Sequence, residues 1–118
     1  MAGTLNKHIT TIPSVKYTEL WYYILAHDIV VVPSLAEWFW FAAAEVCALD
    51  KELVVTNIGS LPEVVSGKIN FVEPADSRSI EEWILNFYHK NFLSIEKKEF
   101  FWSDNVEKTL EIYSNIIN

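Results

Sequence analysis

Short apolar stretches rich in β-branched residues recur along the chain. The unbroken β-branched run at 29–32 is typical of a strand that is buried on both faces, as in parallel sheets. The stretch at 53–56 predicts another short buried strand, and the stretch at 69–72 predicts one more. A Thr- and Ile-rich stretch at 5–12, which ends at Pro13, predicts a further strand. The pattern therefore predicts about four strands, the last of them at 69–72.

Segments with helical periodicity separate and follow these runs. Apolar side chains recur at i, i+3, i+4 and i+7, the spacing of one helix face. Ser79 and Glu82 have the spacing of a capping box, and Ser103 is expected to cap the final helix. The predicted helices cover 17–25, 39–49, a turn at 61–65 with Pro62 in its first turn, and the segments after Ser79 and Ser103.

Alternating strands and helices predict an α/β fold, a Rossmann-like parallel sheet of about four strands flanked by helices. The 118 residues suffice for one domain, 1–118, with an expected radius of gyration of about 13 Å. Ligands of such sheets bind at the carboxyl ends of the strands. The loops 33–38, 57–61 and 73–76 are therefore the candidate site.

Composition narrows the class of function. The net charge is −7 with nine basic residues, which argues against binding to nucleic acid. No apolar run approaches the length of a membrane span, and the single cysteine excludes an internal disulfide, so we expect a cytoplasmic protein. None of the three histidines has a partner at ligand-like spacing, and no metal or cofactor is expected.

Two glutamates mark the entrance and middle of the second predicted helix. Eight residues separate Glu37 from Glu45, a rise of about 12 Å that suits hydroxyl groups at two ends of an extended ligand. Glu45 has apolar neighbours and therefore needs hydrogen-bond donors. The alternative is that Glu45 has no binding role and is a carboxylate that is hydrogen-bonded within the protein or exposed at its surface. Gly59, taken alone, indicates only a turn.

Four pieces of the chain have an order and spacing that resemble a known family. They are His27-Asp28-Ile29-Val30-Val31-Val32-Pro33-Ser34, the pair Glu37 and Glu45, Val54-Val55-Thr56-Asn57-Ile58-Gly59-Ser60-Leu61-Pro62-Glu63-Val64-Val65, and Phe71-Val72-Glu73-Pro74-Ala75-Asp76. The series resembles the donor-binding, C-terminal half of retaining glycosyltransferases with the GT-B fold, the group of glycogen synthases and mannosyltransferases.

The resemblance implies a role for each matched position. Glu37 would contact the sugar of a nucleotide-sugar donor, Glu45 would accept hydrogen bonds from the ribose hydroxyls, and Glu63 would stabilise the loop that carries Gly59. Trp38 and Trp40 stand where the family commonly has glycine, so their indoles would block the pocket, narrow it to another donor or stack on a ring. The implied donor-binding residues are Ser34, Glu37, Trp38, Phe39, Trp40, Glu45 and Gly59.

The family's basic pair for the donor diphosphate, and its acceptor domain, lie upstream of every matched segment. We therefore expect a domain that lacks the first strands and the acceptor domain, and that needs a partner for glycosyl transfer with retention. The partner would be a second copy in a homodimer or a separate acceptor-domain chain. The alternatives are a non-catalytic, self-associating interaction module with the same fold, and a generic flavodoxin-like domain that leaves the Glu spacing unexplained.

Overall fold

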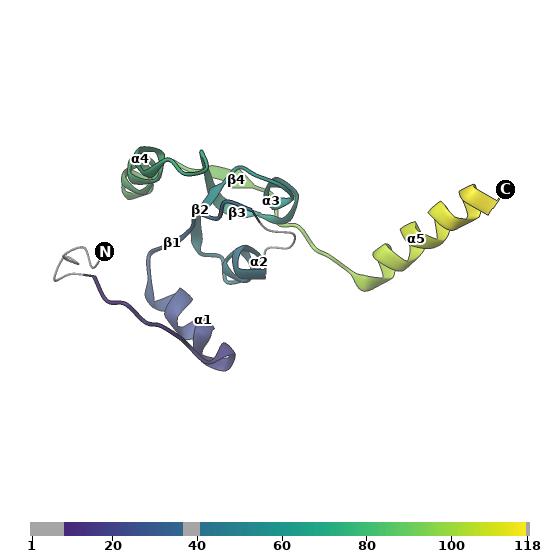
Figure 1. Cartoon of the computed structure of the whole chain (residues 1–118), viewed down its shortest axis with the longest axis horizontal. Helices are drawn as coiled ribbons and strands as arrows, with labels where there is room; N and C mark the ends of the chain where they lie inside the picture. The colour runs from purple at the N-terminus through teal and green to yellow at the C-terminus, as the bar shows by residue number, and fades with distance from the viewer. Residues whose placement is uncertain (1–8, 37–40, 118) are drawn as a thin grey trace.

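The computed structural model describes residues 9–36 and 41–117, and Figure 1 shows their arrangement. Helices and strands alternate through most of the chain. In chain order they are α1 (Tyr17–Ala26), β1 (Ile29–Val32), α2 (Phe41–Ala48), β2 (Glu52–Thr56), α3 (Leu61–Val64), β3 (Gly67–Val72), α4 (Ser77–Tyr88), β4 (Leu93–Ile95) and α5 (Trp102–Ile117).

The four strands form one mixed sheet in the order β1-β2-β3-β4. β1, β2 and β3 are parallel, with Val30 opposite Leu53 and Leu53 opposite Ile69. β4 runs antiparallel to β3, with Ile69 opposite Leu93. The α/β, Rossmann-like class is confirmed, and the parallel strands bring the loops after β1, β2 and β3 to one edge.

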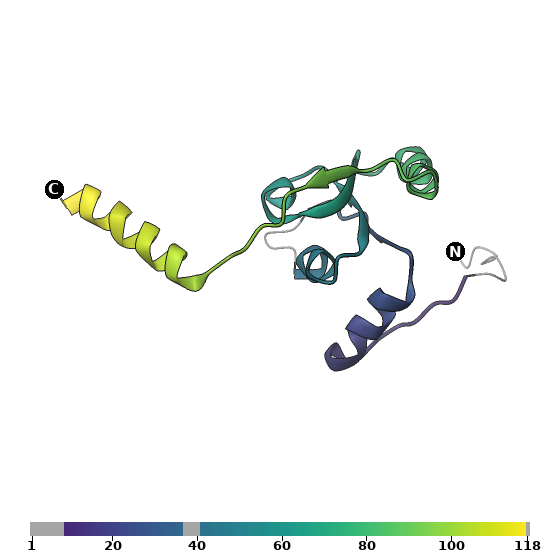
Figure 2. The same ribbon diagram turned by 180° about the vertical axis from the view of Figure 1, so that it is seen from behind.

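Apolar layers cover both faces of the sheet. On one face, Leu53, Val55 and Ile69 pack with side chains of α1, α2 and α3, including the buried Val46. On the other face, Val54 and Val72 pack against α4 through Phe87. Figure 2 shows α2 and α4 on opposite sides of the sheet. Because β2 is covered on both faces, its residues 53–55 are apolar without alternation, whereas β3 includes Lys68 and the buried Asn70.

Two strand predictions are wrong. Residues 9–12 of the stretch predicted as a strand at 5–12 belong to no strand, and the rest of that stretch lies outside the described residues. A β-branched sequence forms a strand only where a neighbouring strand completes the hydrogen-bond ladder. The strand at 69–72 is also not the last, because the three-residue β4 follows it and pairs with β3.

Helix starts also differ from the predicted ones. Asp76 caps α4: its Oδ1 accepts hydrogen bonds from the N–H groups of Arg78 and Ser79 at 2.9 and 3.3 Å. Ser79 therefore lies inside the helix, where its Oγ accepts from the Glu73 N–H. α5 begins at Trp102, so Ser103 lies in its first turn instead of capping it. The predicted start of α2 at residues 39–40 lies outside the described residues.

The expected radius of gyration is also wrong. It is 17.4 Å, and the molecule extends over 63 × 32 × 29 Å. The cause is α5, which projects from the body at the end of an extended segment (Figures 1 and 2). A compact α/β core therefore carries one separate helix.

Candidate functional site

The loops after β1 and β2 are joined at the carboxyl edge of the sheet. Thr56, the last residue of β2, is fully buried, and its Oγ1 donates a 2.7 Å hydrogen bond to the carbonyl oxygen of Ser34. Register places Val32 opposite Val55, so the two loops leave the sheet side by side. The structure thus brings the loop of Ser34 next to the loop of Gly59.

The second loop makes a tight turn between β2 and α3. Ile58 donates its N–H to the Thr56 carbonyl at 3.1 Å, and Gly59 has a positive φ of 54°, a backbone region that favours glycine. The peptide N–H groups of Gly59 and Ser60 have no hydrogen-bond partner among the described residues. Neighbouring free N–H groups in such a turn form an anion-binding concavity.

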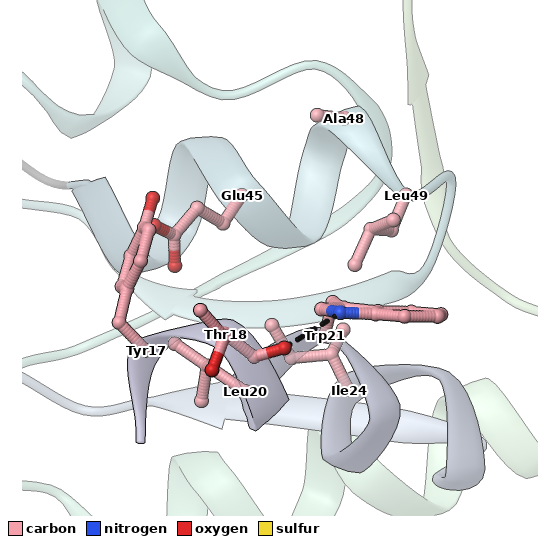
Figure 3. A pocket seen from close by; sticks show the side chains of 8 residues that line it. All are labelled: Tyr17, Thr18, Leu20, Trp21, Ile24, Glu45, Ala48 and Leu49. Atoms are coloured by element: carbon pink, nitrogen blue, oxygen red, sulfur yellow. Dashed lines mark hydrogen bonds between the residues drawn. The ribbon is translucent and has the colours of Figure 1, made fainter. Parts of the chain in front are cut away.

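A groove of about 450 Å³ separates α1 from α2 (Figure 3). Such a volume falls in the usual range for small-molecule sites. Its lining is mostly apolar, and the indole of Trp21 is held in place by a 2.9 Å hydrogen bond from Nε1 to the carbonyl oxygen of Thr18. The lining residues are Tyr17, Thr18, Leu20, Trp21, Ile24, Glu45, Ala48 and Leu49.

Glu45 supplies the carboxylate of this groove. The hydroxyl of Tyr17, on α1, lies beside that carboxylate in Figure 3. Hydrogen bonding to Glu45 and the negative charge of Glu45 raise the pKa of Tyr17 above its ordinary value of 10.0. The Tyr17 hydroxyl therefore stays protonated well above neutral pH, as a donor beside the half-buried Glu45.

The predicted site residues divide into three groups. Ser34 and Gly59 lie at the carboxyl edge of the sheet, whereas Glu45 lies in the groove between the helices, whose lining includes neither of them. Glu37, Trp38, Phe39 and Trp40 lie outside the described residues. That the seven predicted residues bind a donor remains a prediction.

Glu63, expected to stabilise the Gly59 loop, is an exposed residue of α3. Its carbonyl oxygen and that of Pro62 accept hydrogen bonds from Lys98 Nζ, at 3.0 and 2.7 Å. In the third predicted loop, the side chain of Asp76 is engaged in capping α4. The Asp76 carboxylate is thus occupied at the start of α4, and the Lys98 contacts hold the backbone of α3 and not the Glu63 carboxylate.

Sequence reasoning missed two contributors. It assigned Tyr17 only to an apolar helix face, although its hydroxyl is the partner of Glu45. It also treated Thr56 only as the end of a strand, although its hydroxyl joins the two loops. A threonine that closes an otherwise aliphatic strand is the available signal, because a buried hydroxyl needs a hydrogen-bond partner.

Two features of the described residues bear on the class of site. Within 9–36 and 41–117, no cluster of three or more His, Cys, Asp or Glu side chains is arranged to hold a metal ion. In the same part of the chain, no helix is both long enough and apolar enough to cross a bilayer.

Comparison with known families identifies this arrangement. The family described as "Glycosyl transferases group 1" matches residues 2–108, which includes every strand and the first four helices. No curated protein and no solved structure matches the chain. The matched segment covers most of the chain, and the chain belongs to the group 1 glycosyltransferases.

Proposed function

We propose that this chain binds the nucleotide-sugar donor of a glycosyl transfer that proceeds with retention at the anomeric carbon. The observation that carries the proposal is the family match over 2–108. Membership of a glycosyltransferase family supports sugar transfer in general, and the two sites described above support the choice of ligand.

The loop with Gly59 and Ser60 is the proposed diphosphate contact. Its two peptide N–H groups, which have no partner among the described residues, are suited to anionic oxygens. The bond from Thr56 to Ser34 fixes the neighbouring loop beside it, so that Ser34 is within the same edge of the sheet. Ordered donors at this place would stabilise the charge that develops on the leaving diphosphate.

The groove between α1 and α2 is the proposed nucleoside contact. Glu45 offers carboxylate oxygens to the ribose hydroxyls, and the apolar wall with Trp21 offers a surface for the base. Phe41, at the start of α2, is four residues before Glu45, a rise of about 6 Å toward the helix entrance. We propose that an extended nucleotide sugar runs from the groove along α2 toward these loops.

Positive charge for the diphosphate must come from outside the two loops. Residues 33–36 and 57–60 contain neither Lys nor Arg. We infer that a partner, either a second copy or a chain with an acceptor domain, supplies basic side chains and the acceptor site. The chain alone is then a donor-binding unit.

Calorimetric titration of the full chain with UDP-, GDP- and ADP-sugars tests donor binding. At least one donor is expected to bind, and Glu45→Gln is expected to weaken its binding by about 5- to 150-fold, since hydrogen bonds to the half-buried, charged carboxylate contribute about 1–3 kcal/mol. Glu81→Gln, on the exposed side of α4, is the matched control and should bind as the unchanged chain does. No binding of any donor up to millimolar concentration would contradict the proposal.

The stereochemical part of the proposal has its own measurement. Release of sugar from an α-linked donor by the chain together with its partner, followed by NMR of the anomeric proton, is expected to give the α-anomer first. Release of the β-anomer first would contradict retention while leaving donor binding intact.

A further inference from the structure

The groove between α1 and α2 has a polar end and an apolar end. Tyr17, the first residue of α1, and Glu45, in the middle of α2, lie together at one end. The indole of Trp21 lies at the other end (Figure 3). A ligand that joins a hydroxylated part to an aromatic part fits this division, and a nucleoside has both parts.

The Glu45 carboxylate faces this groove without a cation. Among the described residues that line the groove there is no Lys, Arg or His. The Nε1 of Trp21 already donates to the carbonyl oxygen of Thr18 at 2.9 Å. The neutral hydroxyl groups of Tyr17 and Thr18 are therefore the side-chain donors that the lining offers to Glu45. Because a half-buried carboxylate needs hydrogen-bond donors, Glu45 is suited to a ligand that supplies neutral hydroxyl groups.

Tyr17 takes up only part of what the carboxylate can accept. The Tyr17 hydroxyl lies beside the Glu45 carboxylate, and hydrogen bonding between them raises the pKa of Tyr17. The contact is therefore present at neutral pH. A carboxylate has two oxygens and about four acceptor sites, so that one phenol leaves most of them open. Tyr17 thus restrains the direction of the carboxylate and leaves room for a ligand.

The packing of α1 does not depend on Tyr17. Its side chain is 78% exposed, and it is not among the described residues of either apolar layer of the sheet. The buried Ile24 and the partly buried Leu20 hold α1 against the core instead. The effect of the Tyr17 hydroxyl is therefore expected at Glu45 and not on the fold.

A restrained carboxylate favours a ligand with two neighbouring hydroxyl groups. A glutamate side chain loses rotamer freedom when it binds, and a contact that orients it beforehand lowers this cost. Two hydrogen bonds from the 2′- and 3′-hydroxyls of a ribose require one orientation of the carboxylate, whereas a single bond from a 2′-deoxyribose is compatible with several. Orientation of Glu45 therefore strengthens ribose binding more than deoxyribose binding.

We propose that Tyr17 is a positioning residue, which orients the Glu45 carboxylate toward both ribose hydroxyls and so selects ribonucleotide donors over 2′-deoxyribonucleotide donors. The inference rests on the proposed function and deepens it, because it names the class of donor and a residue that acts through Glu45. The selection depends on the geometry of this pair at the polar end of the groove.

Calorimetric titration of the full chain with UDP, GDP and ADP, and with the 2′-deoxy form of each, tests the proposal. The unchanged chain is expected to bind at least one ribonucleotide about 5-fold or more tightly than its 2′-deoxy form. Tyr17→Phe is expected to weaken that ribonucleotide by about 2- to 12-fold and the 2′-deoxy form less, so that the ratio of the two affinities falls. The matched control is Tyr23→Phe, which removes a hydroxyl from the same helix outside the groove lining and should leave the ratio unchanged.

The ratio separates a positioning role from a structural one. Both affinities are measured on the same variant, so a loss of folded protein lowers both equally and does not change their ratio. An unchanged ratio in Tyr17→Phe, or an unchanged chain that binds both forms equally, would overturn the role of Tyr17 while donor binding stands. Absence of binding by all six nucleotides and by the nucleotide sugars would overturn the proposed function and this inference with it.

Discussion

The Thr56 hydroxyl donates a 2.7 Å hydrogen bond to the Ser34 carbonyl oxygen and so joins the loops that follow two neighbouring strands. Thr56 is fully buried, whereas the Ser34 residue is half-buried. We expect Thr56→Val to lower the free energy of unfolding by about 1 kcal/mol, because the shape is kept and the donor is lost. Urea unfolding measures the change.

Thr56→Ser is the control for this bond. It keeps the hydroxyl and loses a methyl group, so it is expected to preserve the loop contact. If Thr56→Val were as stable as the unchanged chain, the hydrogen bond would contribute nothing to the fold.

The positive φ of Gly59 makes a second position testable. Its φ of 54° lies in the left-handed region. Gly59→Ala is expected to destabilise the chain by about 1–2 kcal/mol, the cost of placing a Cβ in this region. Gly59→Asn should cost less, since asparagine tolerates the region better. Equal unfolding midpoints for the alanine and asparagine variants would argue against backbone strain as the cause.

The start of α4 distinguishes two capping residues. Asp76 accepts hydrogen bonds from two helix N–H groups, whereas Ser79 accepts one from Glu73 outside the helix. We expect Asp76→Ala to cost about 1 kcal/mol of stability and Asp76→Asn much less, because asparagine is an equally good cap. Thermal unfolding compares these variants with Ser79→Ala. If Ser79→Ala lowered the stability more than Asp76→Ala, Ser79 would be the capping residue, as the sequence predicts.

The bond between Tyr17 and Glu45 predicts a pH titration. Glu45 raises the pKa of Tyr17. Glu45→Gln is therefore expected to bring that pKa back toward the ordinary value of 10.0, as measured by NMR of labelled tyrosine. Because the folded pKa is raised, the bond is present at neutral pH and is lost as the pH rises through that folded value.

Glu19→Gln is the control for this titration. It removes an exposed carboxylate from the same helix, two residues from Tyr17. If both variants moved the pKa of Tyr17 equally, the effect would be one of general charge and not of the hydrogen bond.

Burial raises the pKa of the Cys47 thiol above its ordinary value, although the N–H of Ser66, 3.4 Å from the sulfur, and the charge of Lys98 act against the shift. We expect iodoacetamide to alkylate Cys47 more slowly in the folded chain at pH 8 than in guanidinium, because the thiolate is the reactive form. Because burial disfavours the thiolate, the folded chain loses stability as the pH rises from the ordinary pKa of the thiol through the raised, folded value. Equal rates in the two states would contradict this account.

The central part of the fold was predictable because burial on both faces leaves a strong signal. The run Ile29–Val32 is a strand with those bounds, and the run at 53–56 forms all but the first residue of β2. β4 was missed because three residues at a sheet edge, of which Leu93 is exposed, carry no apolar run. The stretch at 5–12 was overpredicted because its composition favours strands without showing whether a partner exists.

Only the location of the candidate site could be predicted from the sequence. Parallel strands fix which loops meet, so Ser34 and Gly59 could be placed at one edge from the sequence. The groove at Glu45 could not, because it depends on how α1 packs against α2. That packing brings Tyr17 and Glu45 together across 28 positions of chain, and no local pattern encodes such a contact.

The strand order β1-β2-β3-β4 has a consequence for how the chain folds during synthesis. Each strand after the first pairs with the strand made just before it, as Val31 with Val54 and Val54 with Asn70 show. The sheet can therefore grow from one edge as the chain leaves the ribosome, without waiting for a distant segment to return. The paired residues Val31 and Val54 are 23 positions apart and Val54 and Asn70 are 16 apart, so each step closes a shorter loop than the pairing of distant strands would need.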